Sequence, residues 1–356
     1  KKEEIKMGEK MKAAVITDER KVEIIEIEKP DPREGEILVN IKACALCTWE
    51  QRTFLRIVKM PLPFLGGHEM AGVIEAVGEG VDEEEFPIGQ RVTIRSFNSC
   101  GRCYYCRQGK ENLCINTHKP QPGPRREIDG PGGLGQYLVV RPQDIFKLPN
   151  DLPFEYGAFT EPLACVVNSM EQAQVELGND VVIIGAGIMG LLHVVVSKLR
   201  GARVIVSEPD AERRELAKEV GADILIDPAK EDFVETIKSL TEGRGADVIF
   251  NTTAIAKVAE EAVNGLGKTG RVVMYSSIHP DEPISVSPNW IHNTQVVITG
   301  AVSPPIEAFH TSSILLSKRL IVPEKLISKK FPLEEAQKAF EEAIKPDTYR
   351  IVVMNE

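Results

Sequence analysis

The sequence lacks any long run of apolar residues and has fewer basic than acidic residues. No apolar run approaches the ~20 residues that a membrane-spanning helix needs. The 43 Lys and Arg are outnumbered by 53 Asp and Glu, so the formal net charge of −10 argues against long-range attraction to nucleic acid or an anionic membrane. The stretch Lys1–Lys10 is charged and has no signal-peptide core, so we expect a cytoplasmic protein.

Internal repeats and low-complexity tracts are also absent, which excludes solenoids and fibrous arrays. The one biased segment, residues 116–135, is rich in Pro and Gly and is either a loop at the mouth of a site or a surface loop. Hydrophobic residues make up 42% of the chain and charged residues 27%, which is typical of a soluble globular protein. Because 356 residues exceed what one hydrophobic core usually fills, we expect two domains.

Two patterns divide the chain. Up to about residue 150, short alternating runs such as Lys12–Ile16, Val22–Ile27 and Ile37–Ala43 are separated by turn residues, which predicts a β-rich part. From about residue 155, apolar strands alternate with amphipathic helices such as Ala211–Val220 and Phe233–Leu240. We expect six strands there, at Val181–Ile184, Arg203–Ser207, Ile224–Ile226, Val248–Phe250, Arg271–Tyr275 and Val296–Thr299. This alternation predicts an α/β fold with a doubly wound parallel sheet.

Cysteine is concentrated in two short regions. Four of the seven cysteines form the pattern Cys100-x2-Cys103-x2-Cys106-x7-Cys114, and such spacing in a cytoplasmic chain favours metal binding over disulfides. Four thiolates suit a closed tetrahedral zinc site, so we predict a structural zinc in a lobe of residues 98–116. An iron–sulfur cluster can use similar spacing, but no other feature of the sequence indicates electron transfer.

The segment Val181–Gly190 predicts a dinucleotide site. A strand is followed by the G-x-G-x-x-G turn of Gly185, Gly187 and Gly190 and then by a helix. The glycines permit the tight turn, the approach of a pyrophosphate and the packing of helix on strand. The N-terminus of that helix, with Ile188 and Met189, is expected to face the phosphates.

The end of the second strand indicates which dinucleotide binds. Glu208 follows Gly185 by 23 residues, where a carboxylate accepts hydrogen bonds from the adenosine ribose and repels a 2′-phosphate. NAD is therefore favoured, while Arg213 and Arg214 keep NADP open. The alternative is that Glu208 only caps the helix that begins near Asp210.

The most specific string in the chain is Gly67-His68-Glu69-x2-Gly72-x5-Gly78-x2-Val81. It places an imidazole and a carboxylate side by side, 21 and 22 residues after Cys47. A later carboxylate, Glu161, precedes the nucleotide-binding sheet in the string Phe159-Thr-Glu-Pro-Leu-Ala-Cys165. These are residue types that bind zinc.

Taken together, these motifs resemble the zinc-containing medium-chain dehydrogenases, in the branch of the sorbitol, threonine and similar polyol-type enzymes. The resemblance covers roughly residues 11–356. It implies a GroES-like β-rich catalytic domain of residues 1–157 and 301–356, and a Rossmann NAD-binding domain of residues 158–300. It also implies two zinc ions per chain, a small-molecule polyol or sugar-like substrate, and a homodimer or homotetramer that pairs through the strand Val296–Thr299.

The resemblance also assigns roles. Cys47 and His68 would bind the catalytic zinc, and Glu69 would be a third or exchangeable ligand. Glu161 would bind the metal directly or through water, with Cys165 as the alternative ligand. Zinc would act as a Lewis acid on a substrate hydroxyl or carbonyl. By the same resemblance Glu50 would hydrogen-bond the ligand histidine, and Arg350 would meet the cofactor pyrophosphate.

One residue departs from the family pattern. Two residues after the ligand cysteine, where the family carries Ser or Thr as a proton relay, this chain has Trp49 beside Thr48. An indole cannot relay a hydroxyl proton, so Thr48, a metal-bound water or a neighbouring substrate hydroxyl would replace the relay. An aromatic face there could stack on a sugar or cyclitol ring, although Trp49 could equally point into the core.

We therefore expect a zinc-dependent oxidoreductase that transfers a hydride between NAD and a secondary alcohol or ketone, most simply a polyol, cyclitol or sugar derivative. The alternatives are an NADP-dependent carbonyl reductase, a zinc-free reductase on the same scaffold, and a non-catalytic zinc- and NAD-binding scaffold protein. The zinc-free reductase would lack the ligand set, which is complete here.

Overall fold

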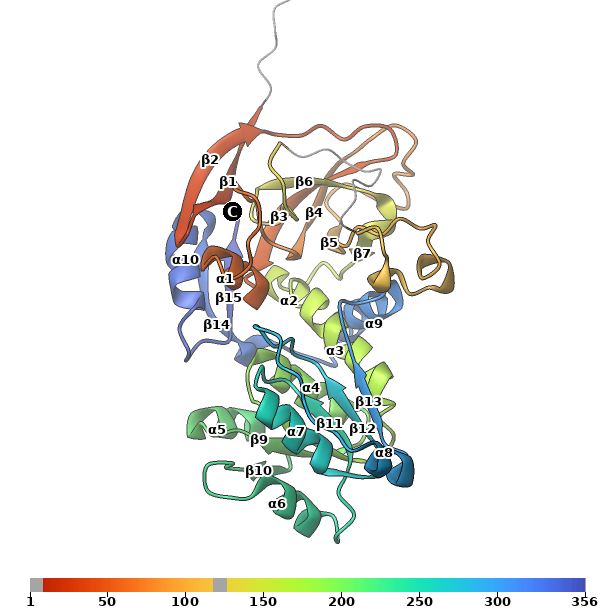
Figure 1. The fold of residues 1–356 in the computed structure, drawn as a ribbon. Coiled ribbons are helices and arrows are strands. Elements are labelled where there is room, and N and C mark those ends of the chain that lie inside the picture. Colours follow the sequence, from red (N-terminus) through yellow and green to blue (C-terminus); the bar gives the residue numbers. More distant parts are fainter. Residues whose placement is uncertain (1–8, 118–126, 356) are drawn as a thin grey trace, which may run out of the picture. The chain divides into compact units, whose positions relative to one another are not determined.

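The computed structural model describes residues 9–117 and 127–355, which separate into two compact units (Figure 1). Unit 1 comprises Lys1–Pro162 and Phe309–Glu356, and unit 2 comprises Leu163–Ala308. The domain boundaries expected from the sequence lie within about ten residues of these, and the assignment of functions to the two parts stays a prediction. Residues 1–8 and 118–126 lie outside the described ranges, so the predictions for the N-terminus and for much of the Pro/Gly-rich segment are not addressed.

Unit 1 is built on antiparallel strands. A hairpin pairs β1 (Lys10–Asp18) with β2 (Lys21–Glu28). The larger sheet has the order β14-β15-β3-β4-β5-β7, and β6 also pairs with β3. Its strands are β3 (Ile37–Ala45), β4 (Glu69–Val77), β5 (Arg91–Ile94), β6 (Tyr137–Val140), β7 (Ile145–Lys147), β14 (Ile327–Pro332) and β15 (Arg350–Met354). The β-rich, GroES-like part predicted from the sequence is confirmed.

Helices of unit 1 are short and lie between the strands. They are α1 (Thr48–Phe54), α2 (Phe154–Gly157) and α10 (Ala336–Ala343). Two further helices, α3 (Thr160–Ala173) and α9 (Ile306–Ser317), contain the boundaries between the two units. Phe54 of α1 meets Phe340 of α10 with ring centroids 5.1 Å apart, and both rings are fully buried. This contact joins the beginning and the end of the sequence in one hydrophobic core.

Unit 2 contains a six-stranded parallel sheet of order β10-β9-β8-β11-β12-β13. The strands are β8 (Asp180–Ile184), β9 (Arg203–Ser207), β10 (Ile224–Ile226), β11 (Ala246–Asn251), β12 (Leu266–Met274) and β13 (Val297–Gly300). The order reverses between β8 and β11, which is the switch point where doubly wound sheets bind ligands. The predicted Rossmann sheet is confirmed, with β9 and β10 at the predicted residues.

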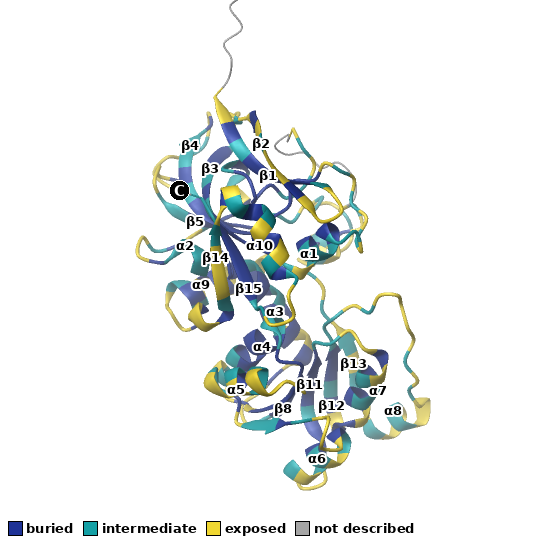
Figure 2. Cartoon of the chain, turned by 90° about the vertical axis from the view of Figure 1, so that its left-hand side faces the viewer, coloured by how far each residue is buried: buried dark blue, intermediate teal, exposed yellow. Residues whose placement is uncertain are grey.

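Helices connect these strands and bury their apolar faces on the sheet. They are α4 (Ile188–Leu199), α5 (Ala211–Glu219), α6 (Phe233–Leu240), α7 (Ala256–Asn264) and α8 (Pro288–Thr294). Side chains of Asp210, Asp232 and Ser287 accept the N-terminal amide hydrogen bonds of α5, α6 and α8. Figure 2 shows the strands of this sheet largely buried and the outward side of α5 exposed.

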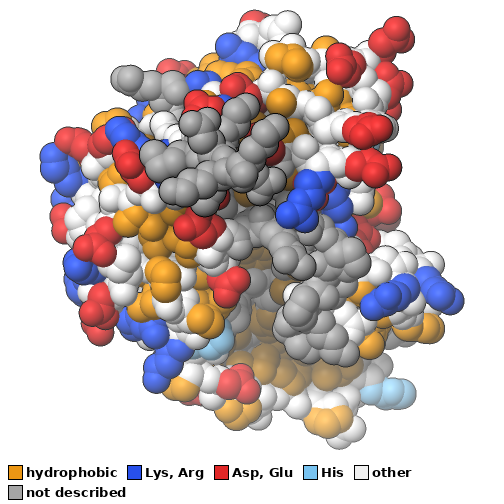
Figure 3. All heavy atoms as spheres, turned by 90° about the horizontal axis from the view of Figure 1, so that it is seen from above, with side chains coloured by type: hydrophobic (Ala, Val, Ile, Leu, Met, Phe, Trp, Pro, Cys, Tyr) orange, Lys and Arg blue, Asp and Glu red, His pale blue; other side chains and the backbone are white. Residues whose placement is uncertain are grey.

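Among the described residues, no helix has the length and apolar character that crossing a membrane requires. On the face seen in Figure 3, acidic side chains gather along the upper right edge, whereas acidic and basic side chains are mixed along the left edge.

Candidate functional site

Two neighbouring strands of unit 1 bring the predicted metal ligands together. β3 and β4 are antiparallel with Ala45 opposite Glu69, so the residues just beyond the end of β3 meet the residues at the start of β4. Cys47 lies two residues beyond β3, at the N-terminus of α1, and His68 directly precedes β4. One ligand atom from each of Cys47, His68 and Glu69 lies within 4.8 Å of the others. Residues remote in sequence therefore form one possible metal site.

Gly67 allows the chain to turn into β4 at this point. Its φ of 92° is in the left-handed region, and an added Cβ would lie 2.7 Å from the Sγ of Cys44. Any other residue would be strained here and would displace the buried Cys44. Cys44 is thus a packing residue beside the site.

Glu50 orients the His68 ring. Its Oε1 lies 2.6 Å from Nδ1 of His68 and also accepts the backbone N–H of Gly67 at 3.0 Å. Since a carboxylate can only accept, Nδ1 carries the proton and Nε2 is left for a cation. Burial disfavours the charged imidazole, but Glu50 and Cys47 outweigh it and raise the pKa of His68 well above its usual value. The ring is therefore a strong base toward a cation.

Glu69 is completely buried and pairs with Arg350, which comes from β15. Burial raises the pKa of Glu69 to about 7, Arg350 lowers it, and the charge of Glu161 raises it further. The guanidinium of Arg350 is 1% exposed and bound to this carboxylate, so the structure gives Arg350 a neighbour that the sequence did not predict. The expected contact of Arg350 with a pyrophosphate stays a prediction.

Glu161, in the first turn of α3, does not belong to the set of three residues whose ligand atoms lie within 4.8 Å. Its charge acts on Glu69 and Arg350, which places it in the same neighbourhood. Direct binding of a metal by Glu161 stays a prediction, as does the alternative role of Cys165.

Trp49 is half-buried and lies against the site. Its ring centroid is 5.9 Å from that of His68 and 5.5 Å from that of Phe64, edge-to-face in both cases. Trp49 was expected either to point into the core or to lie at the metal site. The indole does both, since it packs on the core and also borders His68. Thr48 is the exposed first residue of α1.

The donor set fits zinc. A thiol, an imidazole with its second nitrogen already bonded, and a carboxylate are the ligands of catalytic zinc sites. Oε2 of Glu69 and Oε2 of Glu50 are buried and accept no hydrogen bond in the described part of the chain. Buried carboxylate oxygens without partners are costly, and a cation among them would remove that cost.

The four-cysteine lobe also fits a metal. Sγ atoms of Cys100, Cys103, Cys106 and Cys114 lie within 4.8 Å of one another, and none of the seven cysteines, all within the described ranges, forms a disulfide. Backbone amides donate to the sulfurs, for example Cys103 N to Cys100 Sγ at 3.4 Å. The side-chain amide of Asn116 lies 3.3 Å from Cys100 Sγ and, as its main cause, lowers the pKa of that thiol to about 5. These donors stabilise thiolates, the form that binds zinc.

A buried ionic contact ties the lobe to the rest of unit 1. Glu111, inside the lobe, lies 3.3 Å from the guanidinium of Arg95, which follows β5. Asp144, directly before β7, lies 3.8 Å from the same guanidinium. All three side chains are buried, so the lobe is anchored to unit 1 by charge.

In unit 2 the glycine turn has the geometry that a pyrophosphate needs. Gly185 has a φ of 95°, and an added Cβ on Gly190 would lie 1.9 Å from the carbonyl oxygen of Gly185. At Gly187 the nearest atom to such a Cβ is Nη1 of Arg213, at 4.0 Å, so space remains beside the N-terminus of α4. Ile188 and Met189 form the first turn of that helix and are half-buried. The turn fits a dinucleotide.

Glu208 lies beside this turn, directly after β9. Its two carboxylate oxygens accept the backbone N–H groups of Ala186 at 2.7 Å and of Asp210 at 3.0 Å. A cavity of about 250 Å³ adjoins it, and most of its lining side chains are apolar: Ile184, Gly185, Ser207, Glu208, Pro209, Pro228, Phe233, Thr253, Ile255, Val258 and Glu261. Apolar walls with carboxylates at Glu208 and Glu261 suit an adenosine. Asp210 caps α5 itself, so capping does not account for the position of Glu208.

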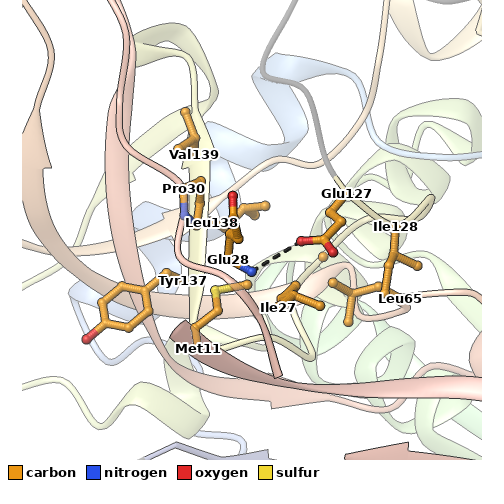
Figure 4. Close-up of a pocket in the computed structure, with 11 residues that line it drawn as sticks. Met11, Ile27, Glu28, Pro30, Leu65, Glu127, Ile128, Tyr137, Leu138 and Val139 are labelled. Carbon is orange, nitrogen blue, oxygen red and sulfur yellow. Dashed lines mark hydrogen bonds between the residues drawn. The ribbon is translucent and has the colours of Figure 1, made fainter. Parts of the chain in front are cut away.

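A second cavity, of about 50 Å³, lies in unit 1 under the β1–β2 hairpin (Figure 4). It is lined mainly by apolar side chains such as Met11, Ile27 and Leu138, and the backbone N–H of Glu28 donates to Glu127 across it at 3.2 Å. None of the predicted site residues lines this cavity.

Sequence reasoning missed the contacts that join distant segments. Arg350 and Glu69 are separated by 281 residues, and nothing in either local sequence indicates their pairing. The role of Asn116 could have been predicted, because an amide side chain two residues after the ligand Cys114 is a signal in the local sequence. The anchor between Arg95 and Glu111 has no comparable signal.

The model of the alcohol dehydrogenase GroES-like domain matches residues 33–150, and that of the zinc-binding dehydrogenase matches residues 189–318. The chain is 33% identical to L-threonine 3-dehydrogenase of Pyrococcus horikoshii, over 98% of this chain and 99% of that protein. It is 29% identical to sorbitol dehydrogenase of Bacillus subtilis, over 94% of each.

A solved structure agrees with the sequence matches. A putative zinc-binding dehydrogenase from Sinorhizobium meliloti, bound to NADP, superposes with a TM-score of 0.89 at 28% identity, covering 97% of this chain and 99% of that one. The fold, the ligand set and the relatives agree with one another. The chain therefore belongs to the zinc-dependent medium-chain alcohol/polyol dehydrogenase family.

Proposed function

We propose that this dehydrogenase transfers a hydride between NAD and a secondary alcohol or ketone, and that its substrate is a polyol, a cyclitol or a sugar derivative. The observation that carries the proposal is the convergence of Cys47, His68 and Glu69, with Glu50 holding the proton of the histidine. One thiolate, one imidazole and a carboxylate leave a coordination position for substrate, as catalysis requires.

Each residue has a part in this proposal. Cys47 and His68 would hold the zinc, which supplies Lewis-acid polarisation of the substrate oxygen when bound. Glu50 fixes the ring of His68 in one tautomer. Arg350 favours the ionised form of Glu69 and holds it in place beside the other two ligands. Glu161 is proposed as the further carboxylate, acting directly or through water.

The position of Trp49 supports a ring-shaped or branched substrate. The indole borders His68 at the place where the family carries a hydroxyl, so a small primary alcohol would gain no proton relay there. A flat aromatic surface instead favours the C–H face of a sugar or cyclitol. The relatives named L-threonine 3-dehydrogenase favour a second candidate, an amino alcohol.

A substrate panel distinguishes these candidates. The zinc-loaded protein is incubated with NAD and with polyols, cyclitols, L-threonine and ethanol, and NADH is followed by absorbance. We expect the highest kcat/KM with a polyol or cyclitol, whereas preference for L-threonine or ethanol would contradict the proposed class. No turnover with any compound, despite bound zinc and NAD, would favour the non-catalytic scaffold.

Trp49→Thr tests the role of the indole within that panel. Restoring a hydroxyl and removing the aromatic surface should lower kcat/KM for the ring-shaped substrate by about tenfold, the value of one aromatic contact, and should raise it for small alcohols. Ile88→Thr, which makes a similar change at an exposed apolar residue outside the predicted site, is the control. An unchanged substrate profile in Trp49→Thr would show that the indole is peripheral.

We propose NAD as the preferred cofactor because Glu208 lies beside the adenosine-sized cavity. A 2′-phosphate in that place would meet the carboxylate and be repelled. We also propose that two copies pair through β13, the edge strand of the unit 2 sheet. Sedimentation of the purified protein tests this, since a monomer at all concentrations would contradict it.

A further inference from the structure

Two consecutive arginines on α5 have different surroundings. Arg213 places its Nη1 4.0 Å from where a Cβ on Gly187 would be, so its guanidinium lies over the glycine turn. Arg214 turns away from that position. Its Nη1 donates to the main-chain carbonyl of Glu208 at 2.5 Å, and its Nη2 donates to Oδ2 of Asp227 at 3.1 Å.

Asp227 is well placed to hold this guanidinium. It directly follows β10, the neighbour of β9, so the carboxyl ends of the two strands bring it close to Glu208. The side chains of Arg214 and Asp227 are only 14% and 13% exposed. Oδ1 of Asp227 accepts the N–H of Ala229 at 3.1 Å, which fixes the carboxylate, and Lys230 pairs with it at 3.0 Å. Ion pairs shielded from water hold more firmly than exposed ones.

We propose that Asp227 is a specificity-determining residue for the dinucleotide, because it sequesters Arg214. The proposal rests on the proposed binding of NAD at Glu208. Held between Asp227 and the Glu208 carbonyl, Arg214 fixes the backbone that carries the ribose-binding carboxylate. The same contact keeps the guanidinium of Arg214, which lies at the main chain of Glu208, from reaching a 2′-phosphate on the ribose. NAD is thus selected in two ways: the carboxylate of Glu208 faces the ribose, and Asp227 holds the guanidinium of Arg214 away from it.

The physical reason is the chemistry of arginine. A guanidinium binds phosphate with two hydrogen bonds and stays charged at all relevant pH values, so a mobile Arg214 beside the ribose would favour a 2′-phosphate. Asp227 gives it a permanent anionic partner instead. If Asp227 is neutral, Arg214 keeps only the carbonyl of Glu208 and can exchange it for a phosphate.

Binding of two small probes tests the proposal without turnover. Calorimetry measures the Kd of adenosine 5′-diphosphate and of adenosine 2′,5′-bisphosphate for the parent and for Asp227→Asn. Asparagine keeps an oxygen for the N–H of Ala229 and presents an amide to Arg214. We expect the affinity ratio to shift toward the bisphosphate by about tenfold, the value of one charge-assisted contact. Asp227→Asn/Arg214→Met should lose this shift.

Asp223→Asn is the matched control. It makes the same change in a more exposed carboxylate, which pairs with Lys198 at 2.7 Å and directly precedes β10, at the opposite end of that strand from Asp227. Its affinity ratio should equal that of the parent. A ratio in Asp227→Asn within twofold of the parent would overturn the proposal.

Arg214→Met alone gives a second, independent measurement should Asp227→Asn fold poorly. We expect weaker binding of adenosine 5′-diphosphate and unchanged binding of the bisphosphate, because Arg214 does not reach the 2′ position in the parent. A selective loss of bisphosphate binding would overturn the proposal. If the parent binds neither probe, the proposed dinucleotide site itself is wrong, which distinguishes the two failures.

Discussion

At the scale of single residues, the site depends on hydrogen bonds that fix the proton of His68 on Nδ1. Glu50 receives both the imidazole N–H of His68 and the amide of Gly67 on one oxygen. A partner of this kind makes a ligand histidine more basic and fixes its ring. Because Glu50 acts through His68, it is a positioning residue.

Glu50→Gln removes the charge and keeps the shape. We expect zinc affinity to fall by about 10–100-fold, the usual effect of changing the partner of a ligand histidine. Competition with a chromophoric chelator measures it, and Glu84→Gln, on an exposed turn, is the control. Zinc affinity equal to that of the parent would mean that the ring is held by packing alone.

His193 makes stability depend on pH. The ring is buried, donates from Nδ1 to the carbonyl of Met189 at 2.7 Å, and lies 2.9 Å from the hydroxyl of Ser169 through Nε2. Burial lowers the pKa of His193 from 6.5 to about 4. Between these values the unfolded chain binds a proton that the folded chain does not, so the free energy of unfolding falls as pH falls from 6.5 toward 4.

From pH 7 to pH 5 this one group should therefore remove about 2 kcal/mol from the free energy of unfolding. Urea unfolding of the parent and of His193→Gln at both pH values measures it, since glutamine does not titrate. The parent should lose more stability than the variant between the two pH values. Equal losses would mean that His193 is charged in the folded state.

At the scale of elements, the lobe of residues 98–116 illustrates a loop held by two kinds of contact. The thiolates gather around one point, and Glu111 reaches Arg95 in the body of unit 1. Breaking a buried ion pair leaves its partner charges without compensation. Exposed pairs have no such consequence.

Arg95→Met should lower the free energy of unfolding by about 3–5 kcal/mol, because the buried Glu111 would lose this guanidinium and Asp144 would keep only Arg141. Thermal unfolding and limited proteolysis of the lobe measure the effect. Lys338→Met, which breaks the exposed pair with Glu335, should cost less than about 1 kcal/mol. A similar loss in both variants would contradict the anchoring role of Arg95.

At the scale of the whole molecule, two metal sites of different kinds predict a simple stoichiometry. The parent should hold two zinc ions per chain, one in the lobe and one beside His68. Cys47→Ser and Cys114→Ser should each retain one, because the ligand sets share no residue. Metal analysis by mass spectrometry measures this. A single ion in the parent would contradict one of the two sites.

Periodicity and local motifs predicted most of the architecture. Apolar runs located all six strands of the parallel sheet, because buried strands are apolar along their whole length. Periodicity does not indicate every boundary: near the end of the chain a 3-10 turn occupies Leu333–Glu335 and α10 begins only at Ala336. The glycine turn and the four-cysteine lobe could be predicted because a few residues close together in the sequence determine their geometry.

Contacts across the sequence could not be predicted in the same way. The partner of Glu69, the position of Trp49 against His68 and the direction in which Arg214 turns depend on packing among distant segments. Two adjacent arginines are equivalent by composition, and only the neighbouring strand β10 distinguishes them. Sequence reasoning therefore named the candidate residues, and the structure adds the contacts that orient them.

The pairing of Glu69 with Arg350 also sets an order of assembly during synthesis. A ribosome makes the chain from its N-terminus, and the four-cysteine lobe is complete once residue 116 has emerged. The carboxylate at residue 69 must wait until 281 further residues have been added before its guanidinium exists. The zinc predicted for the lobe could therefore bind early in synthesis, whereas the predicted second site is complete only after the whole of unit 2 has been translated.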